Sequence, residues 1–283
     1  MGQLLVRHIF RISLVFLSAV CSIAVVAKEN IAQYSFDIYT QENGLPNNLI
    51  QCIYQDSKGW IWVGTSQGLS RFDGYGFRNF LPVSGDSSTL RGTLVRVIKE
   101  DSNGNLLVGT ENGGLNIFNR KTEKFTHPDL SCGNSTIDDI SVNDIEQDAS
   151  GKIWLGTNQN ILVINPEGEV KQLNPQSNIP GFKLEGNFIR VLQFDRNGQL
   201  WIGTNNGVFV YNTVTDFLEP FQLPFLPGGN REIWEIYADD EGMLWIGTYG
   251  NGLFVADPEY ARRYWPELPT YKTWTDVGSC GLS

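Results

Sequence analysis

The sequence predicts an all-β fold built from four-stranded blades, and three observations support it. A segment of about 45 residues recurs five times along the 283-residue chain. Glycine is enriched, with 30 residues, and four of the 8 tryptophans recur at one place in these segments. Each segment alternates short apolar runs with turn-forming residues, as strands do. A period of this length is typical of a β-propeller in which each repeat forms one blade.

Each repeat begins with an Asp that is followed three positions later by a Gly. This pair predicts a type I turn, because the Asp carboxylate accepts backbone N–H groups and the Gly releases the chain into the next strand. Successive Asp residues are 45, 47, 47 and 44 positions apart. The turn residues are Asp56 and Gly59, Asp101 and Gly104, Asp148 and Gly151, Asp195 and Gly198, and Asp239 and Gly242.

The strand after each turn carries a bulky apolar residue and a central glycine. We expect the bulky side chain to wedge between neighbouring blades and the glycine to let adjacent sheets approach closely. The wedge column is Trp62, Leu107, Trp154, Trp201 and Trp245, and the glycine column is Gly64, Gly109, Gly156, Gly203 and Gly247. A hairpin should follow, with positive φ at Gly68, Gly113, Asn160, Gly207 and Gly252.

The other strands of each blade lie on either side of this hairpin. An apolar strand is predicted before each Asp, over Leu49–Tyr54, Leu94–Lys99, Ser141–Glu146, Phe188–Gln193 and Glu232–Tyr237. A polar or aromatic edge strand follows each hairpin, as in Phe77–Phe80 and Val170–Leu173. The repeats therefore extend over residues 28–258, and residues 259–283 should hold the end of the fifth blade and an unfinished next blade. Tyr34–Tyr39 is predicted as an additional strand.

Residues 1–27 are predicted to be a signal peptide. Arg7 and Arg11 form a basic start, the stretch from Ile12 to Val26 is apolar or small, and Ala27 suits signal-peptidase cleavage. An uncleaved membrane anchor is the alternative, although the stretch is shorter than the roughly 20 residues that span a bilayer. The chain is therefore expected to be exported to the periplasm.

Composition limits the chemistry of the chain. The net charge of −10 and the pI of about 4.7 argue against nucleic-acid binding. His8 lies in the predicted signal peptide, so His127 is the one imidazole left for a catalytic triad or a metal site. The repeated Asp residues lack the alternating oxygen ligands of a calcium loop. We expect no catalytic residues, no metal site and no cofactor, and we interpret Cys52 as a small buried side chain.

One column of the strand before each Asp predicts a binding site. Aligned on that Asp, five residues share one register: Gln51, Arg96, Asn143, Arg190 and Trp234. Since the inner strands of a propeller line its central channel, these side chains could form a ring that binds a small-molecule or oligosaccharide-like ligand, either neutral or anionic. In the alternative interpretation, Arg96 and Arg190 pair with acids such as Asp144 or Glu235 and join neighbouring blades.

The first repeat resembles a known family. Gly44–Asn48 (GLPNN), Tyr54–Thr65 (YQDSKGWIWVGT) and Gly68–Tyr75 (GLSRFDGY) are similar to the two-component regulator propeller repeat, and the resemblance covers about residues 34–257. In that family the blades form an exported ligand-sensing region, followed by a membrane helix and a histidine kinase or diguanylate cyclase. The resemblance implies a periplasmic sensing module, membrane-anchored when intact, with its output domain absent from this chain. The chain is expected to be an N-terminal fragment.

Two functions from other classes remain open. The chain could be a secreted propeller lyase or glycosidase, which would need paired carboxylates facing one pocket. It could also be a scaffold that binds another protein across its face. We expect a binding protein and not an enzyme, with any kinase or cyclase activity in a missing C-terminal part.

Overall fold

The computed structural model describes residues 35–131, 140–177, 188–223, 229–257 and 271–273. The chain divides into two compact units, residues 1–38 and 39–283. Residues 35–39 form no strand, so the strand predicted over Tyr34–Tyr39 is wrong over its described part. An extended segment becomes a strand only where another strand accepts its backbone hydrogen bonds, and none of the described strands pairs with it. The predicted signal peptide lies outside the described residues.

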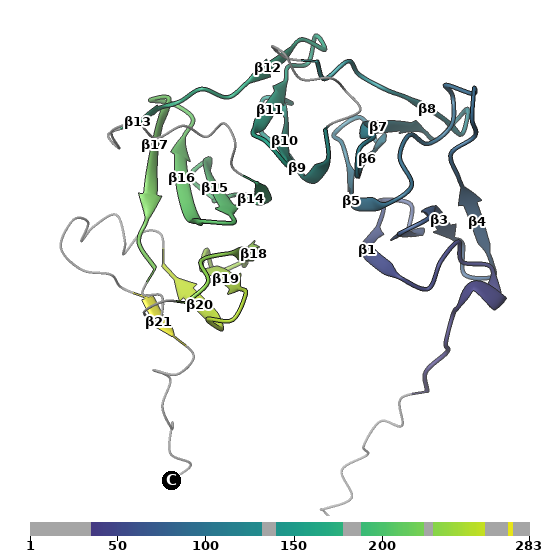
Figure 1. Ribbon diagram of the computed structural model, residues 1–283, viewed down its shortest axis with the longest axis horizontal. Helices are drawn as coiled ribbons and strands as arrows, with labels where there is room; N and C mark the ends of the chain where they lie inside the picture. The colour runs from purple at the N-terminus through teal and green to yellow at the C-terminus, as the bar shows by residue number, and fades with distance from the viewer. Residues whose placement is uncertain (1–34, 132–139, 178–187, 224–228, 258–270, 274–283) are drawn as a thin grey trace, which may run out of the picture. The chain divides into compact units, whose positions relative to one another are not determined.

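Each of the five repeats forms one four-stranded antiparallel blade, which confirms the predicted all-β propeller fold (Figure 1). The first blade consists of β1 (Ile50–Gln55), β2 (Ile61–Thr65), β3 (Gly68–Phe72) and β4 (Phe77–Phe80). The second consists of β5 (Val95–Glu100), β6 (Leu106–Thr110), β7 (Gly114–Asn119) and β8 (Lys124–Thr126). The third consists of β9 (Val142–Gln147), β10 (Ile153–Thr157), β11 (Ile161–Ile164) and β12 (Val170–Gln172).

The last two blades follow the same order. The fourth consists of β14 (Ile189–Phe194), β15 (Gln199–Thr204), β16 (Gly207–Asn212) and β17 (Phe217–Phe221), with β13 (Gln176–Ser177) added parallel to β17. The fifth consists of β18 (Ile233–Ala238), β19 (Leu244–Thr248), β20 (Leu253–Ala256) and β21 (Tyr271–Thr273). One short 3-10 helix, η1 (Gln41–Asn43), precedes them. Among the described residues, no helix has the length and hydropathy needed to cross a bilayer.

The core of the molecule lies between consecutive blades. The inner strands contact one another in chain order, β1 with β5, β5 with β9, β9 with β14 and β14 with β18. Between the first two blades, Trp62 and Leu69 pack with Val95, Ile98 and Phe118, and the Trp62 and Phe118 ring centroids are 5.3 Å apart. Three further clusters join the following pairs of blades in the same way. The first four members of the wedge column, Trp62, Leu107, Trp154 and Trp201, therefore fill the interfaces between blades.

The Asp that opens each turn also holds the wedge tryptophan. In the first blade, Asp56 Oδ1 accepts N–H groups of Lys58 and Trp60, and Oδ2 accepts the Trp62 indole N–H at 2.7 Å. The bond to the indole recurs in the third, fourth and fifth blades. Where the second blade has Leu107, the Asn105 side chain donates to Asp101 Oδ2 at 3.0 Å instead. Sequence analysis placed both columns but missed this link.

The central glycines of the first four blades make the predicted close approaches, and Gly247 of the fifth does not. A Cβ on Gly64 would lie 2.5 Å from Cys52 Sγ and 2.7 Å from Val95 Cγ1 of the second blade. Positive φ was predicted at five hairpin positions, and it occurs at Gly68 (133°), Gly207 (121°) and Gly252 (76°). The prediction is wrong at the other two.

The two exceptions have local causes. The second-blade turn has three residues between its strands, and positive φ falls on Asn112 (53°) and Gly114 (65°) in place of Gly113. In the third blade, the Asn160 N–H donates to Thr157 Oγ1 at 3.0 Å, and this side-chain bond closes the turn without positive φ.

Candidate functional site: a ring of bulge residues

The five residues of the predicted ring occupy one structural position, a β-bulge in each inner strand. In the first blade Ile50 pairs with Thr65 and Cys52 pairs with Gly64, which leaves Gln51 between them as an extra residue. The same shift occurs in all five inner strands. A bulge turns the extra side chain out of the regular alternation of a strand. The extra residues are Gln51, Arg96, Asn143, Arg190 and Trp234.

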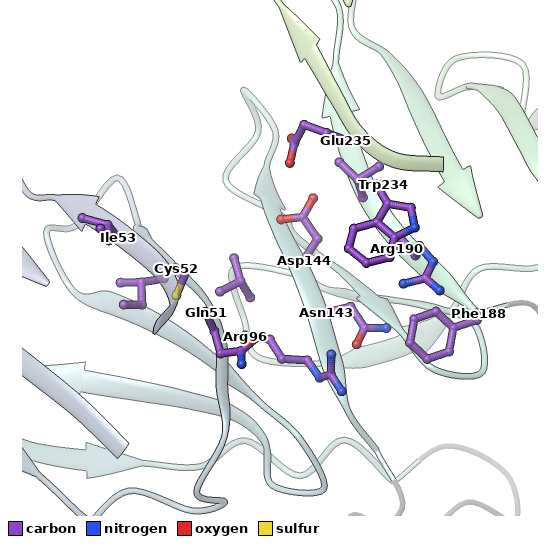
Figure 2. A pocket seen from close by; sticks show the side chains of 13 residues that line it. Gln51, Cys52, Ile53, Arg96, Asn143, Asp144, Phe188, Arg190, Trp234 and Glu235 are labelled. Atoms are coloured by element: carbon purple, nitrogen blue, oxygen red, sulfur yellow. The ribbon is translucent and has the colours of Figure 1, made fainter. Parts of the chain in front are cut away.

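These five side chains line one pocket of about 410 Å³, which we call the bulge pocket (Figure 2). Phe188, Asp144 and Glu235 line it as well. The structure thus brings together the whole ring that the sequence predicts, while ligand binding there stays a prediction. Gln51 and Asn143 supply amide groups, Arg96 and Arg190 supply guanidinium groups, and Trp234 adds a large ring, so the pocket offers donors, acceptors and a flat apolar surface.

Both arginines of the pocket are already paired with carboxylates. Arg190 Nη2 lies 2.9 Å from Glu232 Oε2 of the next blade, and Arg96 Nη2 lies 3.2 Å from Glu111 Oε1 of its own blade. Pairing with acids was the alternative interpretation of these arginines, but the partners are not Asp144 or Glu235. The Nε atoms of both arginines are buried and have no hydrogen-bond partner among the described residues. Each guanidinium group therefore keeps one donor unused.

An aromatic surface forms one wall of the bulge pocket. The Arg190 guanidinium lies 5.0 Å from the Phe188 ring centroid and 5.2 Å from the Trp234 ring centroid, and Figure 2 shows the Trp234 ring beside the Arg190 side chain. Trp234 also stacks on Tyr249, with centroids 5.6 Å apart and an interplanar angle of 19°. Since Trp234 remains 55% exposed, its ring is available to a flat ligand face.

Two carboxylates in the pocket have perturbed pKa values. Asp144 Oδ2 accepts the Leu192 N–H of the next blade at 2.7 Å, and Oδ1 accepts the Ile145 N–H at 2.8 Å. Burial, with the nearby Glu146 charge, raises the pKa of Asp144 to about 7. Burial also raises the pKa of Glu235. Asp144 therefore changes charge near neutral pH.

The sequence predicts Asp144 and Glu235 only as counter-ions and not as pocket residues. A signal was available, because the residue after the ring residue is apolar or small in the other blades (Cys52, Val97 and Val191) and acidic in these two. In the other blades, the residue at this position packs against the central glycine. An acidic residue at such a packed position indicates a candidate functional residue.

The other candidate residues lie apart from this chemistry. Cys52 faces Gly64, and burial raises the pKa of its thiol to about 12, as fits a small packed side chain. His127 follows β8, is half-buried, and does not line the bulge pocket. Burial and the Arg91 charge lower the pKa of His127. Within the described ranges, no group of His, Cys, Asp and Glu side chains has the arrangement of a metal site.

Comparison with solved structures shows the fold that the chain shares with other propellers. The extracellular domain of the putative hybrid two component system BT3049 from B. thetaiotaomicron is 21% identical, with a TM-score of 0.54, over 80% of this chain and 36% of that chain. Virginiamycin B lyase from Staphylococcus aureus is 18% identical, with a TM-score of 0.58, over 75% of this chain and 68% of that chain. At these identities the likeness shows the fold alone.

Sequence comparison identifies the repeats. A curated relative, Histidine kinase P4 of Formosa agariphila, is 32% identical over 68 residues, which are 24% of this chain and 5% of the relative. The chain thus spans a small part of this relative's length. The model of the family described as two component regulator propeller matches residues 44–67, 136–159, 183–206 and 227–250, in four of the five blades. The chain therefore carries repeats of the two-component regulator propeller family.

Proposed function

We propose that the chain is an exported, ligand-sensing propeller module of a signal-transduction receptor, and that the ligand binds in the bulge pocket. The observation that carries this proposal is the contrast between the two kinds of column. The turn and glycine columns are chemically uniform from blade to blade, whereas the five bulge positions hold four different residue types whose side chains line one pocket. The similarity to an extracellular domain of a hybrid two-component system supports a sensing role.

We further propose that the ligand is a neutral, oligosaccharide-like molecule. An anionic group would compete with Glu111 and Glu232 for the two guanidinium groups, and Asp144 and Glu235 add negative charge to the lining. A sugar ring can stack on Trp234, while its hydroxyls can bond to the exposed Gln51 amide and to the Asn143 side chain in the pocket lining. The anionic ligand that the sequence left open is therefore disfavoured.

Signalling would follow from differential affinity. The pocket takes residues from all five blades, so a bound ligand contacts several blades at once. A ligand shifts an equilibrium only by the difference in its affinity for the two states. We propose that binding favours one arrangement of the blades, and that a membrane-bound output domain outside this chain responds to it.

Calorimetric titration of the purified chain with matched neutral and acidic oligosaccharides tests the proposal. Trp234→Ala and Asn143→Ala should each weaken the binding of a neutral oligosaccharide by about tenfold or more. Tyr75→Ala, which changes an aromatic residue that is fully exposed in a turn, is the matched control and should leave affinity unchanged. Equal affinity for the wild type and both pocket variants would exclude the bulge pocket as the binding site.

An enzymatic function is the second candidate, favoured by one observation. Asp144 and Glu235 are two carboxylates that line the same pocket, and a pKa of about 7 suits Asp144 to exchange a proton at neutral pH. Product analysis after long incubation with the ligand separates the two functions. Turnover that is lost in Asp144→Asn while binding is retained would favour a lyase or glycosidase, and intact ligand would favour sensing.

A further inference from the structure

A second pocket, of about 510 Å³, lies between the third and fourth blades and is separate from the bulge pocket. Its lining includes Asp148 and Trp154 of the third blade, and Phe194, Tyr211 and Thr213 of the fourth. Asp148 is the residue that opens the third-blade turn. We call this space the turn pocket.

The equivalent space between the first and second blades is filled by an arginine. Arg120 directly follows β7, as Thr213 directly follows β16. Arg120 Nη1 lies 3.2 Å from Asp56 Oδ2, and Nη2 lies 2.9 Å from Glu100 Oε2. Its side chain is only 13% exposed. The repeat itself therefore shows that a guanidinium group fits between the turn Asp of one blade and the inner strand of the next.

The turn pocket retains the carboxylate of the turn Asp but lacks the guanidinium. The inner strand ends there in Phe194, where the first interface has Glu100. Asp148 accepts N–H groups of Ser150 and Lys152 and the Trp154 indole N–H, as Asp56 does with its own neighbours. Thr213 is too short to reach Asp148, and its hydroxyl donates to the Gly198 carbonyl instead. In the described part of the chain, no cation lies within ion-pair distance of Asp148.

The charge and walls of the turn pocket suit a planar cation. Partial burial opposes ionisation, but hydrogen bonds from Ser150 and Trp154 hold the pKa of Asp148 below its usual value, so the carboxylate is charged at neutral pH. The Trp154 ring centroid lies 5.8 Å from those of Phe194 and Tyr211. Trp154 and Tyr211 are buried and Phe194 is partly exposed. A guanidinium group can therefore pair with the carboxylate and lie against the Phe194 ring.

Two cations also line the turn pocket. The Arg196 guanidinium donates to the Asp239 carbonyl of the fifth blade. The Lys152 ammonium makes no ion pair with Asp148 but contributes positive charge that a bound cation would meet. Removal of the Lys152 charge should therefore strengthen the binding of a cation in the turn pocket.

We propose that the turn pocket binds a guanidinium group of a ligand, such as the side chain of an arginine residue in a peptide. Asp148 is the counter-ion, and the partly exposed Phe194 supplies a ring that the cation can contact. The ligand's guanidinium occupies the place that Arg120 takes between the first and second blades, two interfaces earlier. This site is independent of the sensing role proposed for the bulge pocket.

Titration of the full chain with N-acetyl-arginine amide, followed by tryptophan fluorescence, tests the proposal. Saturable binding is expected. The uncharged analogue N-acetyl-citrulline amide should bind at least about tenfold more weakly. Thr213→Arg should place the chain's own guanidinium in the pocket, abolish this binding and raise the melting temperature. Thr213→Val, which leaves the space open, is the matched control. Lys152→Gln should tighten binding.

Arg120→Thr supplies the converse test at the first interface. This variant should be less stable than the wild type and should regain stability with N-acetyl-arginine amide, because Asp56 and Glu100 remain to receive the guanidinium. The proposal is overturned if the wild type does not bind the arginine probe, if the citrulline analogue binds equally well, or if Thr213→Arg binds like the wild type. Oligosaccharide binding in the bulge pocket should survive Thr213→Arg, which separates this failure from that of the sensing proposal.

Discussion

At the residue scale, the hydrogen bond between the turn Asp and the wedge indole is the contact that most directly couples a turn to the core. Trp62 is fully buried and donates to a buried carboxylate. Trp62→Phe keeps most of the ring but leaves one oxygen of Asp56 without this donor. We expect a loss of about 1–3 kcal/mol of unfolding free energy, the usual cost of removing a partner from a charged buried group.

Urea unfolding checks this value. Trp60→Phe is the control, since the Trp60 ring packs under Arg71 and its indole N–H donates to no acceptor within the described residues. The control should unfold close to the wild-type midpoint. If Trp62→Phe and Trp60→Phe cost the same, the bond to Asp56 contributes nothing beyond ring packing.

Asp144 should make stability depend on pH. Its pKa is about 7 in the folded chain and about 4 in the unfolded chain, so the folded state binds more protons in between. The resulting stabilisation is complete below about pH 4 and is lost as the pH rises through about 7. Wild-type stability relative to Asp144→Asn should therefore fall between pH 4 and 7 and level off above.

Denaturant unfolding of both proteins across this range measures the difference. Glu235 and other titrating groups are common to both proteins and largely cancel in it. Glu146 and Lys99 lie near Asp144 and form an ion pair with each other, so Lys99→Met together with Glu146→Gln tests whether they alter the profile. Parallel pH profiles for wild type and Asp144→Asn would show that Asp144 does not titrate in this range.

At the element scale, the central glycines provide a matched pair of positions. A Cβ on Gly64 would lie 2.5 Å from Cys52 Sγ and 2.7 Å from Val95 Cγ1, whereas one on Gly247 would find its nearest atom, Glu235 Cβ, at 3.6 Å. Gly64→Ala should therefore cost about 1–3 kcal/mol through overpacking. Gly247→Ala should be neutral or slightly stabilising, because alanine restricts the unfolded chain.

Thermal unfolding of the two glycine variants gives the comparison directly. Because both glycines occupy the same place in the same strand, intrinsic strand propensity cancels between them. An equal loss at both positions would mean that contact with the next blade is not the reason for glycine.

Local chemistry explains which elements the sequence could predict. The turn Asp, the wedge and the central glycine act within one blade or between adjacent blades, and repetition makes them visible. The bulges were not predictable, because an extra residue leaves no gap in an apolar strand pattern and appears only when the partner strand is known. The hydrogen bond of Asp144 was not predictable either, because its partner Leu192 lies 48 positions away in the sequence. The ring was found because the bulge recurs at one register.

At the scale of the whole molecule, the first and fifth blades each expose one face. In the other blades the equivalent face is buried against a neighbouring blade. Ile53 is 67% exposed, while its equivalents Ile98, Ile145, Leu192 and Ile236 pack against the preceding blade and are between 0% and 5% exposed. On the fifth blade, Tyr237 is 56% exposed and Trp245 is in none of the core clusters of the described residues. The two faces are the two halves of the interface that joins consecutive blades.

We therefore expect the purified chain to associate head to tail, with the fifth-blade face of one copy on the first-blade face of another. The association should depend on concentration in sedimentation velocity, and Ile53→Asp or Tyr237→Asp should each abolish it. Each variant keeps one intact face, so mixing the two should restore a one-to-one dimer that cannot extend. Val214→Asp, which changes a residue 91% exposed in a turn, should associate like the wild type. If the two variants stay monomeric when mixed, the faces do not recognise each other.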